Sequence, residues 1–472
     1  MNKKSVILAA MLAVGGLTAQ AGGLMTNTNY HIAFDRMMAR GATFDIDAAY
    51  SNPAGLAWGH EGLQLSLNFQ KPWQNRDIEA TVPNFLANPT AGYAGYNFNQ
   101  QYKGKASAPI VPALFASYRD DRWTVSGMLG IVGSGGYVKY DDGIPMLSVP
   151  LTAMLAQKGV KPTDYTLDSK MEGKQYIYGL QANFTYRLTD FLAAAVGLRA
   201  NYYDGFNRGH LIAKGGTALG GAELVNLQLD CLQKGWGFAP IVGVDFKLGA
   251  LNIAARYEFR TKINTENDTQ ELSAKIKNTD PTTATAVPYI EGATALAQFG
   301  DKVTPYEDGN HTRYDMPSLL SVAAGYEFTD KLRATVEYHF FDDKHAKMAG
   351  DRQEALAGGT NEFLLGVEYD INDKFTVSCG GQRTDYGLAD GYQTNTSFAC
   401  DSWSFGLGGA WNITNDIRLN VGYFMSIYSD YERSFAQGDP AKGEGYHGVG
   451  YAGKDVYSRT NNVIGVGIDY RF

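Results

Sequence analysis

Hydrophobic and polar residues alternate with a period of two at the end of the chain. Over Thr460 to Phe472, one side of an extended strand would be mostly apolar, and the other side small or charged. The apolar side comprises Asn462, Ile464, Val466, Ile468, Tyr470 and Phe472. A strand with lipid on one face and a watery or protein-filled lumen on the other has this pattern. A soluble sandwich strand can share it, so the assignment depends on whether the pattern recurs.

The same alternation recurs from Glu61 onward, and short and long connections between the segments take turns. The short connections are rich in Asp, Asn and Gly, as tight hairpin turns are. The sequence therefore predicts about fourteen strands, with tight turns and longer loops alternating between them. The expected strands cover residues 63–70, 109–118, 123–132, 176–188, 191–203, 236–248, 251–263, 319–328, 332–341, 363–371, 375–383, 403–413, 417–428 and 460–472.

Tight turns on one side and long loops on the other are characteristic of outer-membrane barrels. Closure of an even-stranded sheet removes the exposed edges that lipid would not tolerate. We therefore expect an all-β fold, a transmembrane antiparallel β-barrel over residues 61–472. Two expected lipid-facing rows are Trp403, Phe405, Leu407, Trp411 and Ile413, and Leu332, Ala334, Val336, Tyr338 and Phe340. Charged alternates should form a lumenal network rather than a catalytic site: Arg256, Glu258, Arg260, Arg333, Glu337, His339, Glu368 and Arg418.

The N-terminus has the features of a secretory signal peptide over residues 1–21. Lys3 and Lys4 precede a short apolar run, and a small-residue cleavage site ends at Ala21. A transmembrane anchor is the alternative, but the run is short for one. The 55 Gly, 30 Tyr and 23 Phe suit close-packed strands with aromatic girdles. The net charge of −8 argues against nucleic acid as a partner.

Residues 22–60, between the signal and the first strand, do not fit a plain pore. The stretch from Gly41 to Leu56 is too irregular for a strand and too apolar for a disordered tail. A barrel of this size needs something in its lumen if it is not to leak, and this segment would serve as a folded plug, or hatch. The expected hatch residues include Gly22, Leu24, Phe44, Asn52, Pro53 and Ala54.

Several short motifs give this chain a resemblance to a known family. Asn52-Pro53-Ala54-Gly55-Leu56 follows Ala42, Asp45 and Asp47. Further matching positions are Val111-Pro112, Gly235 to Phe238, Tyr257 to Ile263, Met316-Pro317, Val322, Gly325-Tyr326 and Asp469 to Phe472. In this order, the motifs resemble the FadL/TodX family of outer-membrane transporters for long-chain fatty acids and aromatic hydrocarbons. The resemblance implies binding of a hydrophobic substrate at extracellular loops and transfer to an apolar pocket touched by the hatch N-terminus.

The resemblance also implies that the substrate leaves sideways, through a gap made by a kink in the third strand. Lateral exit is physically favourable because an apolar substrate gains by entering lipid rather than water. The kink candidates here are Gly130, Gly133, Ser134, Gly135 and Gly136, since glycines weaken strand pairing and permit bulges. The alternative is that these residues simply begin a loop.

Three of the expected long loops contain apolar segments. The loop over 143–161 carries Met146, Leu147, Leu151 and Leu155. The loop over 205–235 has a helix-like piece around 224–232, with Leu224 and Leu227, and the loop over 264–312 has one around 293–299. Exposed apolar loops would provide a capture site for a greasy substrate. The same segments could instead pack on each other as a lid.

The remaining motifs carry no chemistry. Gly443 to Gly448 matches the dinucleotide pattern GxGxxG, but no strand precedes it and no helix follows. The histidines and cysteines have no metal-ligand spacing, although Cys231 and Cys400 could pair as a disulfide. No serine lies in a nucleophile elbow. We therefore predict a transporter rather than an enzyme, without metal or cofactor.

The predicted partners follow from this assignment. They are hydrophobic small molecules such as fatty acids and hydrocarbons, outer-membrane lipids, and the barrel-assembly machinery, which would recognise the terminal Phe472. The protein is expected to be a monomer in the bacterial outer membrane. The rival hypotheses are a general diffusion porin, an outer-membrane lipase, and a surface lipid-binding or adhesin barrel.

Overall fold

The computed structural model describes residues 30–87, 94–108, 110–278, 284, 288–296 and 304–472. The predicted signal peptide, together with Gly22 and Leu24 of the predicted hatch, lies outside the described residues. Within them, no helix is both long and apolar enough to cross a membrane.

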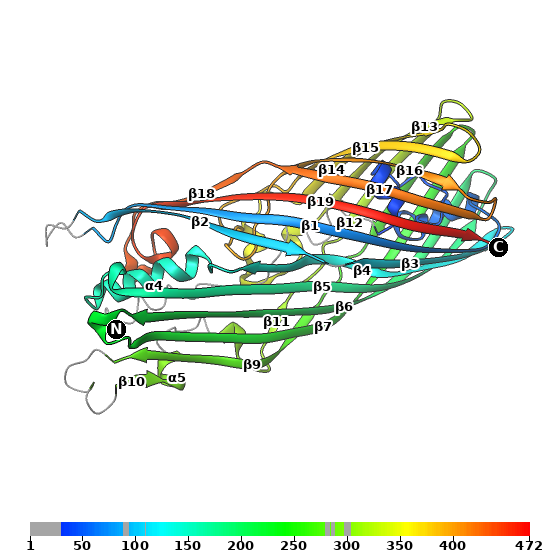
Figure 1. Ribbon diagram of the computed structural model, residues 1–472. Helices are drawn as coiled ribbons and strands as arrows, with labels where there is room; N and C mark the ends of the chain where they lie inside the picture. The colour runs from blue at the N-terminus through cyan, green and yellow to red at the C-terminus, as the bar shows by residue number, and fades with distance from the viewer. Residues whose placement is uncertain (1–29, 88–93, 109, 279–283, 285–287, 297–303) are drawn as a thin grey trace.

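The wall of the molecule is one antiparallel sheet that closes on itself (Figure 1). Closure is made by β1 (Gly62–Phe85) and β19 (Gly453–Arg471), which pair from Gln64 and Arg471 to Thr81 and Lys454. The predicted fourteen-stranded barrel is confirmed. Between these two strands, the wall contains β3 (Val111–Asp120), β4 (Trp123–Tyr140), β5 (Tyr165–Arg187), β6 (Leu192–Gly215), β7 (Glu223–Leu248), β8 (Leu251–Glu258), β12 (Leu319–Glu327), β13 (Leu332–Phe341), β14 (Thr360–Asp370), β15 (Phe375–Asp385), β16 (Ser402–Asn412) and β17 (Ile417–Tyr428).

Five further strands extend this wall at the end opposite the tight turns. They are β2 (Tyr96–Ser107), which leads into β3, β9 (Asn264–Lys277), β10 (Tyr289–Glu291), β11 (His311–Arg313) and β18 (Tyr431–Phe435). The wall is much taller on one side, because β7 has 26 residues and β13 has 10. At a rise of about 3.3 Å per residue, these lengths correspond to roughly 85 and 33 Å. We call the end with the C-terminus and the tight turns the lower end, and the opposite end the upper end.

The strands run further upward than the sequence predicted. The prediction of a loop over residues 205–235 is wrong in large part, because β6 continues to Gly215 and β7 begins at Glu223. The helix-like piece expected around 224–232 is therefore strand, and β9 occupies much of the loop expected after residue 264. Only the lower part of each strand alternates strictly between apolar and polar residues, as lipid on one face requires. In the upper part, pairing with neighbours determines the strand instead.

The outer face carries a band of exposed apolar side chains with aromatic residues along both edges. Leu407 is 60% exposed, and Val336 and Ile464 are also exposed, as the alternation predicted. Ring pairs lie along the upper edge, where Tyr202 and Trp236 have centroids 4.7 Å apart. Others lie along the lower edge, where Tyr470 and Phe472 have centroids 4.4 Å apart. Girdles of this kind flank the lipid-facing zone of transmembrane barrels.

Helices occupy the inside of the barrel at both ends (Figure 1). α2 (Ile32–Met37), α3 (Ala48–Ser51) and η1 (Pro53–Trp58) lie at the lower end, and α4 (Pro145–Gln157) at the upper end. The shorter helices are η3 (Pro162–Asp164), η4 (Thr217–Leu219), α5 (Gly292–Leu296), η6 (Thr304–Tyr306), η7 (Asp343–His345), η8 (Ala349–Ala355), η9 (Pro440–Lys442) and η10 (Tyr446–Gly448). Cys231, Cys379 and Cys400 are free thiols, so the disulfide considered between Cys231 and Cys400 does not form.

Candidate functional site

A row of wall glycines makes room for the first helix of the N-terminal segment. We call these six residues the glycine belt, and they are Gly366, Gly380, Gly406, Gly408, Gly422 and Gly465 of β14, β15, β16, β17 and β19. Neighbours in the belt pair across the ladder, as Gly380 does with Gly366 and with Gly406. A Cβ on Gly380 or Gly366 would overlap the carbonyl oxygen of Met37. Glycine here therefore allows the α2 backbone to touch the wall.

Polar bonds fix α2 against the same side of the barrel. His31 Nε2 lies 3.0 Å from Asp469 Oδ1, and Asn68 Oδ1 accepts from the Ile32 amide at 3.1 Å. The buried Arg36 forms an ion pair with Glu368. Asp35 is also buried, and burial raises the pKa of its carboxyl well above its usual range. Buried charges are costly unless they are paired. The position of α2 therefore depends on both Arg36 and Glu368 being in place.

The Asn52-Pro53-Ala54 motif contacts the opposite side of the barrel. Asn52 caps η1 by accepting from the Ala54 amide at 3.3 Å, and its side-chain amide donates to the Val244 carbonyl of β7 at 3.1 Å. Thr185 of β5 donates to the Pro53 carbonyl at 2.8 Å. Ala54 is fully buried, whereas Phe44 is half-buried, with the Lys247 ammonium 5.0 Å from its ring centre. The described segment 30–60, which we call the hatch segment, is thus held by strands on both sides of the lumen.

An apolar cluster lies directly above the hatch segment. We call it the middle cluster; the hatch segment contributes Tyr30, Ile46, Ala48, Ala49, Tyr50 and Leu56. The wall and loops contribute Ala113, Phe115, Met128, Val132, Ile177, Tyr203, Ile263, Tyr314, Met316, Leu319, Phe341 and Ala349. The stacked rings of Tyr203 and Tyr314 have centroids 5.0 Å apart. The lumen therefore changes from polar contacts below to an apolar interior at mid-height.

The glycine-rich stretch of β4 is irregular on both of its edges. Against β5, the register shifts twice, between Ile131 and Gly133 and again between Ser134 and Gly136. Gly136 has φ +75°, and its amide donates to Ser134 Oγ at 2.8 Å. A Cβ on Gly136 would meet nothing within 4 Å, whereas one on Gly130 would lie 3.4 Å from Ala113 Cβ. The two shifts leave Val132 and Gly135 without a register partner in β5, as β-bulges do.

On its other edge, β4 loses its ladder over the same stretch. Pairing with β3 ends at Leu114 and Leu129, and pairing with β2 resumes at Ala106 and Val138. Among the described residues, no strand pairing joins β4 to β3 or β2 between these two points. We call this interval the ladder break. Val132, in the middle of it, is fully buried in the middle cluster, so the break faces the apolar part of the lumen.

The six residues predicted to form the capture site belong to a second apolar cluster at the upper end. Met146, Leu147, Leu151, Leu155, Leu224 and Leu227 are all buried there, at no more than 8% exposure. We call this the upper cluster. The α4 helix packs in it against Ile78, Tyr102, Val138, Met171, Ile276 and Tyr457. The apolar loop segments thus pack on each other, as in the lid alternative, rather than facing solvent.

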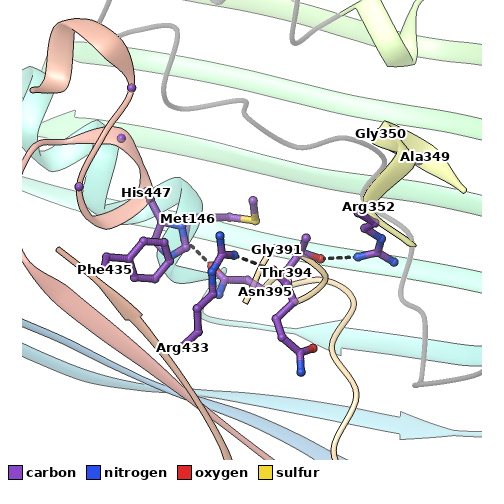
Figure 2. Close-up of a pocket in the computed structure, with 14 residues that line it drawn as sticks. Met146, Ala349, Gly350, Arg352, Gly391, Thr394, Asn395, Arg433, Phe435 and His447 are labelled. Carbon is purple, nitrogen blue, oxygen red and sulfur yellow. Dashed lines mark hydrogen bonds between the residues drawn. The ribbon is translucent and has the colours of Figure 1, made fainter. Parts of the chain in front are cut away.

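A pocket of about 430 Å³ lies beside the upper cluster (Figure 2). We call it the outer pocket. Met146, one of the six predicted capture residues, lines it. Its other lining residues are Ala349, Gly350, Arg352, Gly391, Gln393, Thr394, Asn395, Arg433, Phe435, Gly443, Gly445, His447 and Gly448. Arg352 donates to Thr394 Oγ1 at 3.0 Å, and His447 Nε2 lies 2.9 Å from Asp455 Oδ2. Ala349 belongs to the middle cluster as well, so the outer pocket and that cluster adjoin.

Sequence reasoning missed the polar side of this pocket. Arg352 lies in η8, whereas Arg433 of β18 and His447 of η10 both belong to the connection between β17 and β19. The glycine-rich run from Gly443 to Gly448 stood out in the sequence only as a rejected dinucleotide pattern, and four of its residues line the pocket.

The architecture is that of a transmembrane β-barrel with a folded segment inside it. Comparison with solved structures shows that it has the fold of the FadL/TodX barrels. It is similar to a Pseudomonas aeruginosa FadL homologue, with a TM-score of 0.63, 13% identity and coverage of 96% of this chain and 100% of that chain. For the Ralstonia pickettii toluene transporter TbuX, the TM-score is 0.52 at 13% identity, covering 97% of this chain and 100% of that chain. For the P. putida toluene transporter TodX, the TM-score is 0.53 at 13% identity, covering 96% of this chain and 99% of that chain. No family model and no curated protein matches the sequence.

Proposed function

We propose that the protein is a channel of the bacterial outer membrane that takes up hydrophobic small molecules such as long-chain fatty acids or aromatic hydrocarbons. Two structures of the same fold are named as toluene transporters, which supports an apolar substrate. The apolar outer band supports a membrane location. The chain would act as a monomer, and its exposed Phe472 would be recognised during barrel assembly.

The observation that carries the proposal is the ladder break beside the middle cluster. A substrate would be captured at the outer pocket and the upper cluster, and would then move to the middle cluster. From there it would leave sideways between β3 and β4 into the lipid. Transfer of an apolar molecule into lipid is favourable, at roughly 25 cal/mol per Å² removed from water. The hatch segment would stay in place and block ions during passage.

The test is to make β4 a regular strand. Gly133→Val and Gly135→Val together favour continuous pairing and fill space at the break. Gly136 should be kept, because its positive φ strains any other residue. Uptake of radiolabelled decanoate and toluene by cells should fall about ten-fold or more if the lateral route supplies most of the flux.

Gly381→Val on β15 is the matched control. A Cβ there has its nearest neighbour, the Ser404 carbonyl oxygen, at 3.6 Å, which is ordinary contact. This variant should keep normal uptake, and all variants should keep heat-resistant mobility on gels. Normal uptake by a folded Gly133/Gly135 variant would overturn the lateral route and favour passage past the hatch segment.

A further inference from the structure

The outer face of β1 carries a lysine inside the apolar band. On that face Lys71 lies between Phe69 and Trp73, which are 39% and 41% exposed. Its register partner in β19 is the exposed Ile464, and Lys71 is itself exposed. A charged side chain in the middle of a bilayer is costly, and the cost falls toward the headgroups. We therefore expect the Lys71 ammonium to contact headgroups rather than acyl chains.

The height of Lys71 on the wall agrees with such a contact. It comes seven residues after Gln64, which pairs with Arg471 at the lower end. Seven residues span about 23 Å along a strand, and a tilt of about 40° reduces this to roughly 18 Å of height. The lipid-facing band of a transmembrane barrel is about 25 Å tall. The Lys71 Cα thus lies in the upper part of the band, where a long lysine side chain can extend upward to the headgroups.

Three more lysines lie further up on the same outer face. Lys105 and Lys103 belong to β2, which pairs with β1 (Figure 1), and both are exposed. Lys139 of β4 is the register partner of Lys105. Like charges directly opposite each other on neighbouring strands are destabilising. We call these four residues, Lys71, Lys103, Lys105 and Lys139, the lysine patch.

The chain neutralises little of the lysine patch. Among the described residues, only Lys139 of the four forms an ion pair, with Asp141 at 2.6 Å. Asp141 is 62% exposed, so water screens this pair. Asp77 is the register partner of Lys103, but no ion pair joins them, and β2 contains no acidic residue. The patch therefore keeps a positive charge.

The neighbouring strands of the wall are different. Lys174 of β5 pairs with Asp204 of β6 at 2.6 Å, and Arg208 of β6 pairs with Asp230 of β7 at 2.7 Å. The chain thus supplies carboxylates for the cations of β5 and β6 but not for those of β1 and β2. A surface with unpaired lysines at the edge of a lipid band attracts anionic headgroups.

Above the lysine patch, the exposed side chains of β2 are polar and uncharged. Gln101, Asn99 and Asn97 follow Lys103 toward the upper end, all on the outer face and all exposed. Amide side chains both donate and accept hydrogen bonds, as contacts with sugar hydroxyls require. From bottom to top, this part of the wall is therefore apolar, then cationic, then rich in amides.

We propose that the outer face of β1 and β2 is a docking surface for a phosphorylated glycolipid of the outer leaflet. The long loops at the upper end would lie outside the cell, as they do in outer-membrane barrels, so the patch faces the outer leaflet. The acyl chains would pack on Phe69 and Trp73, and the phosphates would bind Lys71 and Lys105. The sugars would contact the amides above.

The inference rests on the proposed membrane location and goes beyond the proposed function, because this lipid is a resident of the membrane and not a substrate. It also places the lipid beside the ladder break. Ala106 and Val138 form the first pair above the break, and Lys105 and Lys139 form the next. The bound lipid would therefore border the break on its outer side.

The test measures lipid binding to the purified full chain in a non-ionic detergent, by native mass spectrometry. The probes are lipid A, which is a phosphorylated glycolipid, and fully dephosphorylated lipid A. The wild-type protein should bind lipid A at least about ten-fold more tightly, since each lysine near an anionic headgroup contributes about five-fold in affinity. This comparison needs no variant, so it does not depend on the folding of one.

Two pairs of substitutions then locate the site. Lys71→Gln with Lys105→Gln should weaken binding of lipid A about 25-fold and leave the dephosphorylated lipid unchanged. Lys71→Arg with Lys105→Arg should keep the preference. Lys331→Gln with Lys374→Gln is the matched control, because both lysines are exposed in tight turns at the lower end. This control should bind lipid A as the wild-type protein does.

Four results would overturn the proposal. Equal binding of the two forms of lipid A by the wild-type protein would exclude recognition of phosphate. An equal loss in the lower-end control would mean general attraction between charges rather than a site. Equally tight binding of phosphatidylglycerol would exclude a glycolipid site, and displacement of lipid A by decanoate would assign the surface to the substrate. The proposed function stands apart from all four if the Gly133/Gly135 variant still loses uptake of toluene.

Discussion

The lower and upper halves of the lumen are filled in opposite ways. Below, the hatch segment is held by ion pairs and hydrogen bonds, and its backbone touches the glycine belt. Above, α4 and the surrounding strands are held mainly by apolar contact in the upper cluster. A polar contact that is broken in a buried place leaves an unsatisfied group, at a cost of about 1–3 kcal/mol each. Apolar contacts can be exchanged for those of an apolar ligand, so the lower half suits a seal and the upper half suits capture.

Removing most of the hatch segment should have the largest effect. Deletion of residues 22–50 takes away α2 and the ion pair of its Arg36 with Glu368 of the wall. The barrel should still insert, since its ladder is intact, but it should conduct ions. Planar-bilayer conductance checks this. If conductance stays at the closed level of the intact protein, the hatch segment is not the seal.

A single substitution in the glycine belt should weaken the same seal less severely. Gly380→Val places a side chain where the Met37 carbonyl lies, and overpacking of this kind costs about 1–3 kcal/mol. Intermittent ion conductance should appear, with the barrel still folded. The neighbouring Gly381→Val, which has room for its side chain, should remain closed. Equal conductance of the two variants would contradict a specific role for the belt.

A substitution in the upper cluster should lower substrate uptake without opening the barrel to ions. Leu151 of α4 is fully buried in the upper cluster. Leu151→Asp removes its apolar contacts and buries a charge, which costs about 3 kcal/mol or more. Uptake of decanoate should fall several-fold while conductance stays closed. Gln157→Asp, at an exposed position of the same helix, should leave both unchanged. A rise in conductance of Leu151→Asp would mean that the upper half also seals.

The smallest effect concerns pH and one upper loop. Burial raises the pKa of Asp343 to about 6, from 3.8 in an open chain. Below pH 3.8 the Asp343 carboxyl is protonated in both the folded and the unfolded loop. Between pH 3.8 and about 6 it ionises in the unfolded loop but stays protonated in the folded one. The folded loop therefore loses stability as the pH rises, by at most about 3 kcal/mol above about pH 6. Asp343→Asn should slow proteolysis of the loop at pH 7.5 but not at pH 3.5. Equal protection at both pH values would contradict the burial of this carboxyl.

The sequence predicted the barrel because lipid imposes strict alternation on every strand that it touches. The strand count and the outward positions of Trp403, Phe405 and Leu407 follow from that constraint alone. Above the lipid the constraint ends, so the upper parts of β6, β7 and β9 were taken for loops. The glycine belt could not be predicted, because its meaning depends on α2, which is distant in the sequence. Lys105 and Lys139 likewise become neighbours only when β2 pairs with β4, past the intervening β3.

The hatch segment also determines how the sheet closes. Two consecutive residues bond to opposite sides of the seam, His31 to Asp469 of β19 and Ile32 to Asn68 of β1. A slip of two residues between β1 and β19 would keep every side chain on its proper face, yet shift one side by about 7 Å. The two bonds could not both survive such a shift. The segment therefore selects one stagger of the closing strands, and the stagger sets the diameter of the barrel.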